Sequence, residues 1–233
     1  KKELQNLEDS YVRETLNKVL KQNPKLAKAI NQKSPRAKQY KEAVKKTREK
    51  LRKEYGIFSE QTGQREKLLE ELKKSKNKEK IIKKLLCLHP STKERLEIYP
   101  ELYKEIFKIT GKPKIILDLG CGMNPVSCIY THLKQARYYA TEISKKDCEF
   151  LNNYFRIMGI KGKAMPLDLK KTEKIAKLPK ADLCLLFKVL DTIEEKGHKL
   201  AEKIIKKINA DWIIASFATK SVKGTPMRHP YRG

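Results

Sequence analysis

Short apolar runs alternate with amphipathic segments from Lys114 onward, and this alternation limits the fold more than any other feature of the sequence. The apolar runs span residues 114–120, 136–142, 163–168, 181–189 and 211–217. The segments between them, at 125–133, 144–159, 170–178 and 192–209, carry apolar residues at helical spacing. This order predicts an α/β fold with a doubly wound, mostly parallel sheet and helices on both faces. In such a sheet the ligand lies beyond the carboxyl ends of the strands.

The first 90 residues have a different character, with 26 Lys and Arg against 12 Asp and Glu. Apolar residues recur at helical spacing over 11–24, 34–56 and 66–89, and no strand pattern is present. We therefore predict a small, basic, all-helical domain at residues 1–88 and an α/β domain at residues 89–233. Only 16 residues follow the last apolar run, and we expect the C-terminal strands of the sheet to be missing from this chain.

The net charge of +26 is the main guide to the partner. A field of this sign attracts phosphate backbones, which favours nucleic acid. No apolar run reaches 18 residues and the first residues do not resemble a signal peptide, so we expect a cytoplasmic protein that does not bind membranes. The five cysteines form no C-x-x-C pair and the four histidines are scattered. We read the thiols as reduced and expect no metal site.

The first apolar run of the α/β part ends in "DLGCGMNP", residues 118–125. A dinucleotide-binding turn would need a third glycine, and here Pro125 follows Asn124 instead. The D-x-G-x-G pattern after a first strand resembles motif I of the S-adenosylmethionine-dependent methyltransferases. In that motif, Gly120 and Gly122 let the backbone approach the methionine part of the cofactor.

Two acidic residues at later strand ends support this interpretation. Glu142 ends the second apolar run, 22 residues after Gly120, where a carboxylate can accept both hydroxyls of a ribose. Asp168 ends the third run and is placed for the amino group of an adenine, with Leu169 beside it for contact with the ring.

Further blocks resemble a known family. "LCLHPSTKERLEIYPELYKEIF", residues 86–107, is similar to the H-x-S-T-x-E-R-L block of the 16S rRNA guanine-N7 methyltransferases that confer aminoglycoside resistance. "ILDLGCGMNPV", "LLFKVLDTIE" and "ASFATKSVKG" match further blocks of this family in the same order, over roughly residues 10–225. The resemblance implies a Rossmann-like class I methyltransferase domain, preceded by an all-helical domain, with S-adenosyl-L-methionine as the cofactor.

The resemblance also implies roles for individual residues. Arg95 would bind the carboxylate of the cofactor through its planar donor fork. Asn124 would stiffen the glycine turn or bound the pocket. Asp118 and Phe187 would also bind the cofactor. The catalytic residues near the target base would be Lys188, Glu194 and Lys220.

The sequence departs from the family pattern at a few positions. Asp191 and Ala218 each stand where the family has proline, on the base side of the expected pocket. Gly120 stands where the family pattern has alanine, and we expect this difference to be harmless.

The expected partner is small-subunit rRNA within the 30S subunit, bound by a monomer. Two basic clusters are candidates for docking on RNA phosphates: Lys45, Lys46, Arg48, Arg52 and Lys53, and Lys73, Lys74, Lys76 and Lys78. We expect the target base to be flipped out, against Phe217 or Tyr231. The alternatives are a non-catalytic ribosome assembly factor that retains the fold, and a methyltransferase of another RNA.

Overall fold

A computed structural model of the chain describes residues 7, 9–30, 38–54, 62–133, 135–193 and 199–218. The chain divides into two compact units, Lys1–Glu60 and Gln61–Gly233. We describe each unit by itself.

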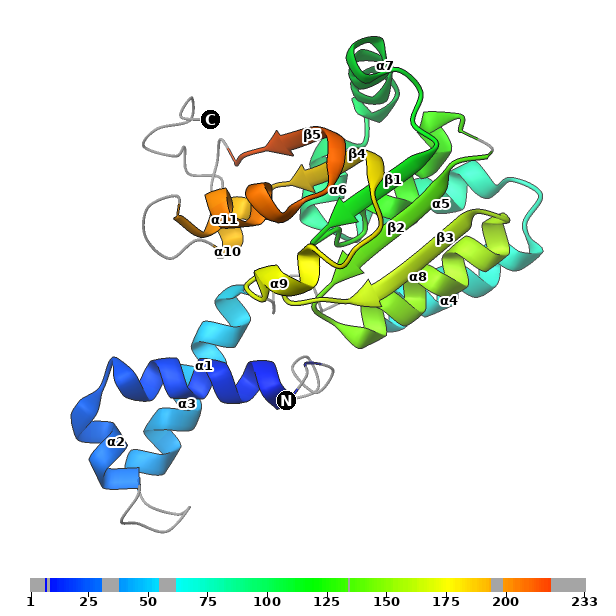
Figure 1. Ribbon diagram of the computed structural model, residues 1–233. Helices are drawn as coiled ribbons and strands as arrows, with labels where there is room; N and C mark the ends of the chain where they lie inside the picture. Colours follow the sequence, from blue (N-terminus) through cyan, green and yellow to red (C-terminus); the bar gives the residue numbers. More distant parts are fainter. Residues whose placement is uncertain are drawn as a thin grey trace. The chain divides into compact units, whose positions relative to one another are not determined.

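The first unit contains the helices α1 (Asp9–Lys21), α2 (Pro24–Ile30) and α3 (Lys38–Glu54), which pack on one another (Figure 1). Along α3, Ala43, Thr47 and Leu51 recur every four residues and are at most 5% exposed, so they form one face of the helix. Tyr11 and Val19 of α1 are also buried. The predicted helical character of this region is confirmed.

The second unit is built on a parallel sheet of β1 (Ile115–Leu119), β2 (Arg137–Glu142), β3 (Lys161–Pro166), β4 (Ala181–Phe187) and β5 (Ala210–Ser216). The strand order is β3-β2-β1-β4-β5, and every neighbouring pair is parallel (Figure 1). The predicted doubly wound α/β fold is confirmed. The order reverses at β1, so a crevice is expected beyond the carboxyl ends of β1 and β4.

Helices cover both faces of the sheet because the side chains of its strands alternate between two cores. Leu183 and Leu185 of β4 face a core shared with α4 (Thr62–Lys74), α5 (Lys78–Cys87), α7 (Tyr99–Thr110) and α8 (Lys145–Met158). Cys184 and Leu186 face the opposite core, which contains residues of α9 (Thr172–Ile175), α10 (Leu190–Ile193) and α11 (Lys199–Lys207). Among the described helices, none is both long and apolar enough to span a membrane.

Two predicted helices differ in detail. The segment after the glycine turn is the 3₁₀ helix η3 (Asn124–Thr131), and it ends at His132 in a left-handed conformation. The described parts of the segment at 192–209 belong to the separate helices α10 and α11.

The helices at residues 62–87 pack in the sheet unit, although we grouped them with the N-terminal domain. Leu68 and Leu72 of α4, and Leu85 and Leu86 of α5, belong to the core on one face of the sheet. The compact units therefore meet at residues 60 and 61, whereas we predicted a boundary at 88. The short helix α6 (Pro90–Arg95) follows α5 directly.

Candidate functional site

The glycine turn after β1 is fastened to the end of β2. Gly120 and Gly122 have φ angles of 59° and 51°, in the left-handed region that favours glycine. The amide of Gly120 donates to Thr141 Oγ1 at 3.3 Å, and the amide of Cys121 donates to the Thr141 carbonyl at 2.9 Å. These bonds hold the turn at the carboxyl edge of the sheet.

Side chains approach both glycines closely. A Cβ atom on Gly120 would lie 2.4 Å from Val189 Cγ2 and 3.3 Å from Leu169 Cδ1. A Cβ atom on Gly122 would lie 3.1 Å from His89 Nε2. Because the valine side chain is stiff, an alanine at position 120 would require a shift of Val189. The packing of Val189 therefore favours glycine over alanine at position 120, whereas we expected this difference from the family to be harmless.

Glu142 lies at the end of β2, next to the glycine turn. Its Oε2 accepts a hydrogen bond from the Gly122 amide at 2.9 Å, and its Oε1 accepts one from the Ile143 amide at 2.7 Å. Burial raises the pKa of Glu142 to about 7, and the nearby Asp147 carboxylate adds to the shift. The two amides fix the carboxylate beside the glycine turn.

Asp168 and Leu169 follow the end of β3. Asp168 Oδ1 accepts from the Lys170 amide at 3.0 Å, and its buried Oδ2 has no hydrogen-bond partner within the described part of the chain. Leu169 is 4% exposed and lies against the glycine turn. The loop after β3 therefore brings an apolar side chain to the turn, with an acceptor on the preceding residue.

Arg95 lies at the end of α6 and is 7% exposed. Its guanidinium carbon lies 5.1 Å from the centre of the Phe187 ring and 5.8 Å from that of Tyr99. Its Nε donates to the Tyr99 hydroxyl at 3.3 Å, while its buried Nη1 has no partner among the residues described. A buried cation is thus held by two rings, with a donor still available to an anion.

Lys188 follows β4 directly and has a φ angle of 57°, which is uncommon for a residue with a side chain. Its ammonium group pairs with Glu94 of α6. The neighbouring residues, Phe187 and Arg95, also contact each other. Two adjacent contacts therefore join the end of α6 to the end of β4. In the part of the chain described here, Lys188 is the predicted catalytic residue that can be placed, since Glu194 and Lys220 lie outside it.

Asp118 and Asn124 contact each other beneath the turn. Asp118 is 0% exposed, and its Oδ2 accepts from Asn124 Nδ2 at 2.9 Å and from the Tyr138 hydroxyl at 2.7 Å. Asn124 is 1% exposed, and its Oδ1 accepts from the Tyr99 hydroxyl at 3.0 Å. Burial raises the pKa of Asp118 to about 6. These buried hydrogen bonds fix the two ends of the glycine turn, which lies between Asp118 and Asn124.

The raised pKa of Asp118 has a consequence for stability. Because this carboxyl binds its proton more tightly in the folded than in the unfolded chain, stability falls as the pH rises from about 4 to about 6. The Asp118→Asn variant should lose less stability over this range, by on the order of 2–3 kcal/mol. Urea unfolding of both proteins at pH 4.5 and 7 measures the difference. Equal losses in the two proteins would contradict a raised pKa for Asp118.

The predicted RNA-binding residues lie on helices of both units. On α3, Lys45 and Arg48 are exposed, Lys46 bonds Asn23 and Glu42, and Arg52 is half-buried. Lys53 lies in the same helix. The second cluster, at the junction of α4 and α5, is exposed throughout: Lys73, Lys74, Lys76 and Lys78.

The sequence analysis missed two residues that support the site. Tyr99 joins Arg95 to Asn124, and its spacing of four residues from Arg95 was a usable signal. Arg65 of α4 bonds Asp147 of α8 at 2.6 Å and Met123 of the turn at 3.4 Å. No sequence pattern indicated that a lysine- and arginine-rich helix would bury one of its cations.

The comparison with protein families agrees with this geometry. Residues 23–231 match the model of the ribosomal RNA methyltransferase family FmrO. The chain belongs to this family.

Named relatives match the chain over 60–78% of its length. It is 27% identical to a 16S rRNA (guanine(1405)-N(7))-methyltransferase from Micromonospora rosea over 190 residues, which are 78% of this chain and 68% of that protein. It is 30% identical to the enzyme of the same name from Micromonospora echinospora over 142 residues, 60% of this chain and 51% of that protein. The chain thus spans about half to two thirds of these relatives.

Solved structures show the same fold. The 16S rRNA methyltransferase RmtF, in complex with S-adenosyl-L-homocysteine, superimposes with a TM-score of 0.76 at 23% identity over 95% of this chain and 78% of that one. The 16S rRNA methylase RmtB gives a TM-score of 0.71 at 24% identity, over 94% and 80% of the two chains. The likeness confirms the class I methyltransferase architecture.

The two positions where this FmrO-family chain departs from the expected prolines contact each other. The amide of Ala218 donates to Asp191 Oδ2 at 2.8 Å. Proline at 218 has no amide hydrogen to donate. The two differences are therefore one physical feature, which joins α10 to the segment after β5.

Proposed function

We propose that this chain is an S-adenosylmethionine-dependent methyltransferase that modifies N7 of a guanine in the decoding region of 16S rRNA. The observation that carries the proposal is the convergence of the glycine turn, Glu142, Asp168 and Arg95 in a member of the FmrO family. We further propose that it acts as a monomer in the cytoplasm, where its ribosomal substrate is found.

The residues present fit the cofactor. The buried Nη1 of Arg95 is a cationic donor with no partner in the described residues, which suits the carboxylate of S-adenosylmethionine. The equally unpartnered Oδ2 of Asp168 suits the amino group of adenine. Glu142 would accept the ribose hydroxyls, and Leu169 and Phe187 would contact the rest of the cofactor. When bound, the cofactor supplies a methyl group on a positively charged sulfur.

The proposed reaction needs no general base. N7 of guanine already carries a lone pair in the plane of the ring and has no proton to lose. The protein's part is to hold N7 in line with the methyl group, and such positioning can lower a barrier by roughly 7–11 kcal/mol. Lys188, with Glu194 and Lys220, is proposed to hold the target base, and Phe217 or Tyr231 to stack on it.

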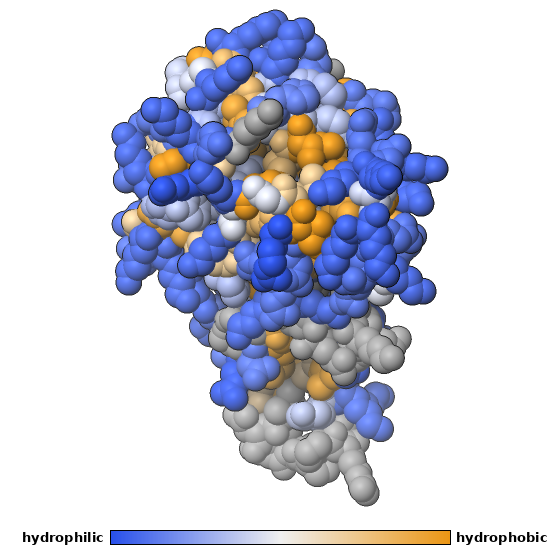
Figure 2. Space-filling view, turned by 90° about the vertical axis from the view of Figure 1, so that its right-hand side faces the viewer, coloured by the Kyte–Doolittle hydropathy of each residue, from blue (hydrophilic) through white to orange (hydrophobic). Residues whose placement is uncertain are grey.

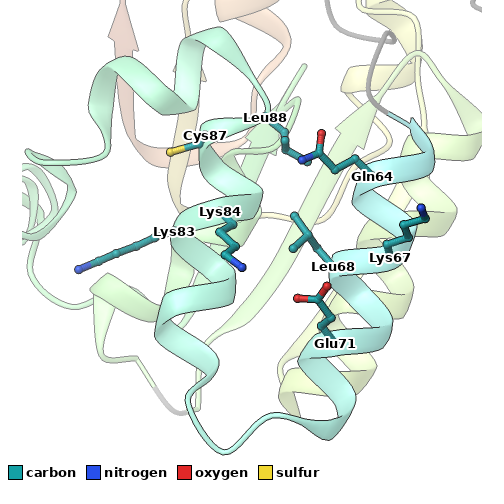
Figure 3. Close-up of a pocket in the computed structure, with 8 residues that line it drawn as sticks. All are labelled: Gln64, Lys67, Leu68, Glu71, Lys83, Lys84, Cys87 and Leu88. Atoms are coloured by element: carbon teal, nitrogen blue, oxygen red, sulfur yellow. The ribbon is translucent and has the colours of Figure 1, made fainter.

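The exposed lysines at the junction of α4 and α5 are proposed to contact the RNA backbone: Lys73, Lys74, Lys76 and Lys78. Figure 2 shows one side of the molecule, where a group of hydrophobic residues is enclosed by hydrophilic ones. The two helices also border an open groove of about 900 Å³, and Figure 3 shows Lys84 and Glu71 pointing toward it while Lys83 points away. Its lining is Gln64, Lys67, Leu68, Glu71, Lys83, Lys84, Cys87 and Leu88.

Replacing the four lysines at residues 73, 74, 76 and 78 with alanine should weaken binding to 30S subunits and flatten its dependence on salt. Each lost phosphate contact reduces the slope of log K against log salt by about 0.7–0.9. Filter binding from 50 to 300 mM KCl measures this slope.

The matched control removes the same charge from α11, at Lys199, Lys203, Lys206 and Lys207, all exposed. We expect the control to bind nearly as the unchanged protein does. An equal loss in both variants would contradict a docking face at α4 and α5, because it would show that only the net charge matters.

The proposed activity is tested by incubating 30S subunits with the protein and S-adenosylmethionine carrying a labelled methyl group. Label should enter 16S rRNA, and cleavage at N7-methylguanine followed by primer extension should map it to one guanine of the decoding region. Label at another base or in another RNA would overturn the proposed target. Calorimetry with S-adenosylhomocysteine separates this enzyme from a non-catalytic assembly factor, which would show no binding.

A further inference from the structure

A chain of buried hydrogen bonds runs from Arg95 to Asp118. Arg95 Nε donates to the Tyr99 hydroxyl at 3.3 Å, and this hydroxyl donates to Asn124 Oδ1 at 3.0 Å. Asn124 Nδ2 then donates to Asp118 Oδ2 at 2.9 Å. Each link has its donor on the Arg95 side, so the chain leads from a guanidinium to a carboxylate without a reversal.

The chain of hydrogen bonds joins four separate elements. Its members lie at the end of α6, at the start of α7, at the start of η3 and in β1. All of them are at most 7% exposed, which places the bonds away from water, where they are stronger and their loss is more damaging. The carboxylate of Asp118 only accepts, so it fixes the Asn124 amide with Nδ2 toward β1 and Oδ1 toward Tyr99.

Tyr99 is the link between the two halves of the candidate site. On one side it orients Arg95, whose Nη1 remains available, and its ring lies 5.8 Å from the guanidinium carbon. On the other side it bonds Asn124, the first residue after the glycine turn to enter η3. Burial raises the pKa of Tyr99, so the hydroxyl keeps the proton that it donates.

We propose that Tyr99 and Asn124 are positioning residues that hold Arg95 and the glycine turn in one fixed relation, so that both meet the amino-acid part of the cofactor together. This inference rests on the proposed use of S-adenosylmethionine. Neither residue is assigned a contact with the cofactor. Without Tyr99, the guanidinium and the turn would each remain in place but would vary in orientation relative to one another.

Tyr103 provides a matched control on the same helix. It is 1% exposed, against 0% for Tyr99, and its hydroxyl also makes a buried bond, at 2.8 Å to Ser127 Oγ. Within the described part of the chain, the Tyr103 hydroxyl makes no hydrogen bond to Arg95. Loss of either hydroxyl should therefore lower stability by a similar amount, while only the loss at Tyr99 should change the affinity for the cofactor.

The experiment compares the full-length Tyr99→Phe and Tyr103→Phe proteins by calorimetry with S-adenosylhomocysteine and by thermal unfolding. We expect Tyr99→Phe to weaken binding about 10-fold, the loss of about one hydrogen bond to a charged group, and Tyr103→Phe to change it less than 2-fold. In the methylation assay, Tyr99→Phe should raise KM for S-adenosylmethionine and leave kcat at saturating cofactor within about 3-fold. Equal affinities of the two variants would overturn the proposal.

A double variant adds a second test. If Tyr99 and Asn124 act through one chain of hydrogen bonds, the double variant Tyr99→Phe, Asn124→Ala should bind the cofactor no more weakly than the weaker-binding of the two single variants. Losses that add would overturn the proposal. Should the unchanged protein bind S-adenosylhomocysteine but methylate no rRNA, the proposed function fails while the comparison of the two tyrosines still decides this inference. Absence of binding by the unchanged protein would overturn both.

Discussion

Replacing Arg65 with methionine is expected to lower the free energy of unfolding of the sheet unit by about 3–5 kcal/mol, because it breaks a buried ion pair. Arg65 Nη2 lies 2.6 Å from Asp147 Oδ1, and the two side chains are 6% and 9% exposed. The same guanidinium lies 5.3 Å from the centre of the Phe150 ring and bonds Met123 of the glycine turn. The variant therefore loses contacts to α8 and to the candidate site at once. Urea unfolding followed by circular dichroism measures the loss.

An exposed ion pair on the neighbouring helix serves as the control. Lys83 and Glu79 of α5 lie 3.1 Å apart with side chains 53% and 61% exposed, so Lys83→Met should cost far less stability than Arg65→Met. The double variant Arg65→Met, Asp147→Leu should recover part of the stability lost by the single change, since the buried carboxylate is then removed together with its cation. A cost for Arg65→Met no larger than that for Lys83→Met would contradict the role of this pair.

The Arg65 pair also explains why the unit boundary could not be predicted. Helical spacing shows which face of α4 is apolar, but it does not show which element covers that face. The basic composition of residues 1–90 is continuous, so it suggested one domain. In the structure, Leu68 and Leu72 complete a core on the sheet, and the partner of Arg65 lies 82 residues away.

The strands and the turn were predictable because their signals are local. A buried parallel strand is a short apolar run, and a glycine with a positive φ is needed where β1 turns sharply. Glu142 and Asp168 could be placed at strand ends from the sequence because acidic residues stand out against apolar runs. Asn124 is different: it lies 25 residues from Tyr99 and 6 from Asp118, and only the fold brings the three together.

The contacts of the residues proposed to lie near the target base were predicted less completely, again for a physical reason. The pairing of Lys188 with Glu94 depends on the left-handed backbone at Lys188, which no pattern in the sequence announces. The bond between Asp191 and Ala218 likewise joins two departures from the family pattern that looked independent. Backbone geometry decides which side chains pair across loops, and the spacing of residues in the sequence says little about that geometry.

Replacing Arg95 with glutamine is expected to weaken the binding of S-adenosylhomocysteine about 100-fold, because each charge-assisted hydrogen bond proposed between Arg95 Nη1 and the cofactor carboxylate is worth about 1.5–3 kcal/mol. Arg95 is 7% exposed, and its guanidinium lies against the rings of Phe187 and Tyr99. Calorimetry gives the affinity, and thermal unfolding shows whether the variant remains folded.

Two further variants separate charge from shape at this position. Arg95→Lys keeps the charge but not the planar fork, and we expect it to recover less than half of the lost binding free energy. Lys93→Gln removes an exposed cation from the same helix and should leave the affinity within about 2-fold. An Arg95→Gln protein that is folded and binds as tightly as the Lys93→Gln protein would show that the cofactor carboxylate lies elsewhere, and would move the proposed site away from α6.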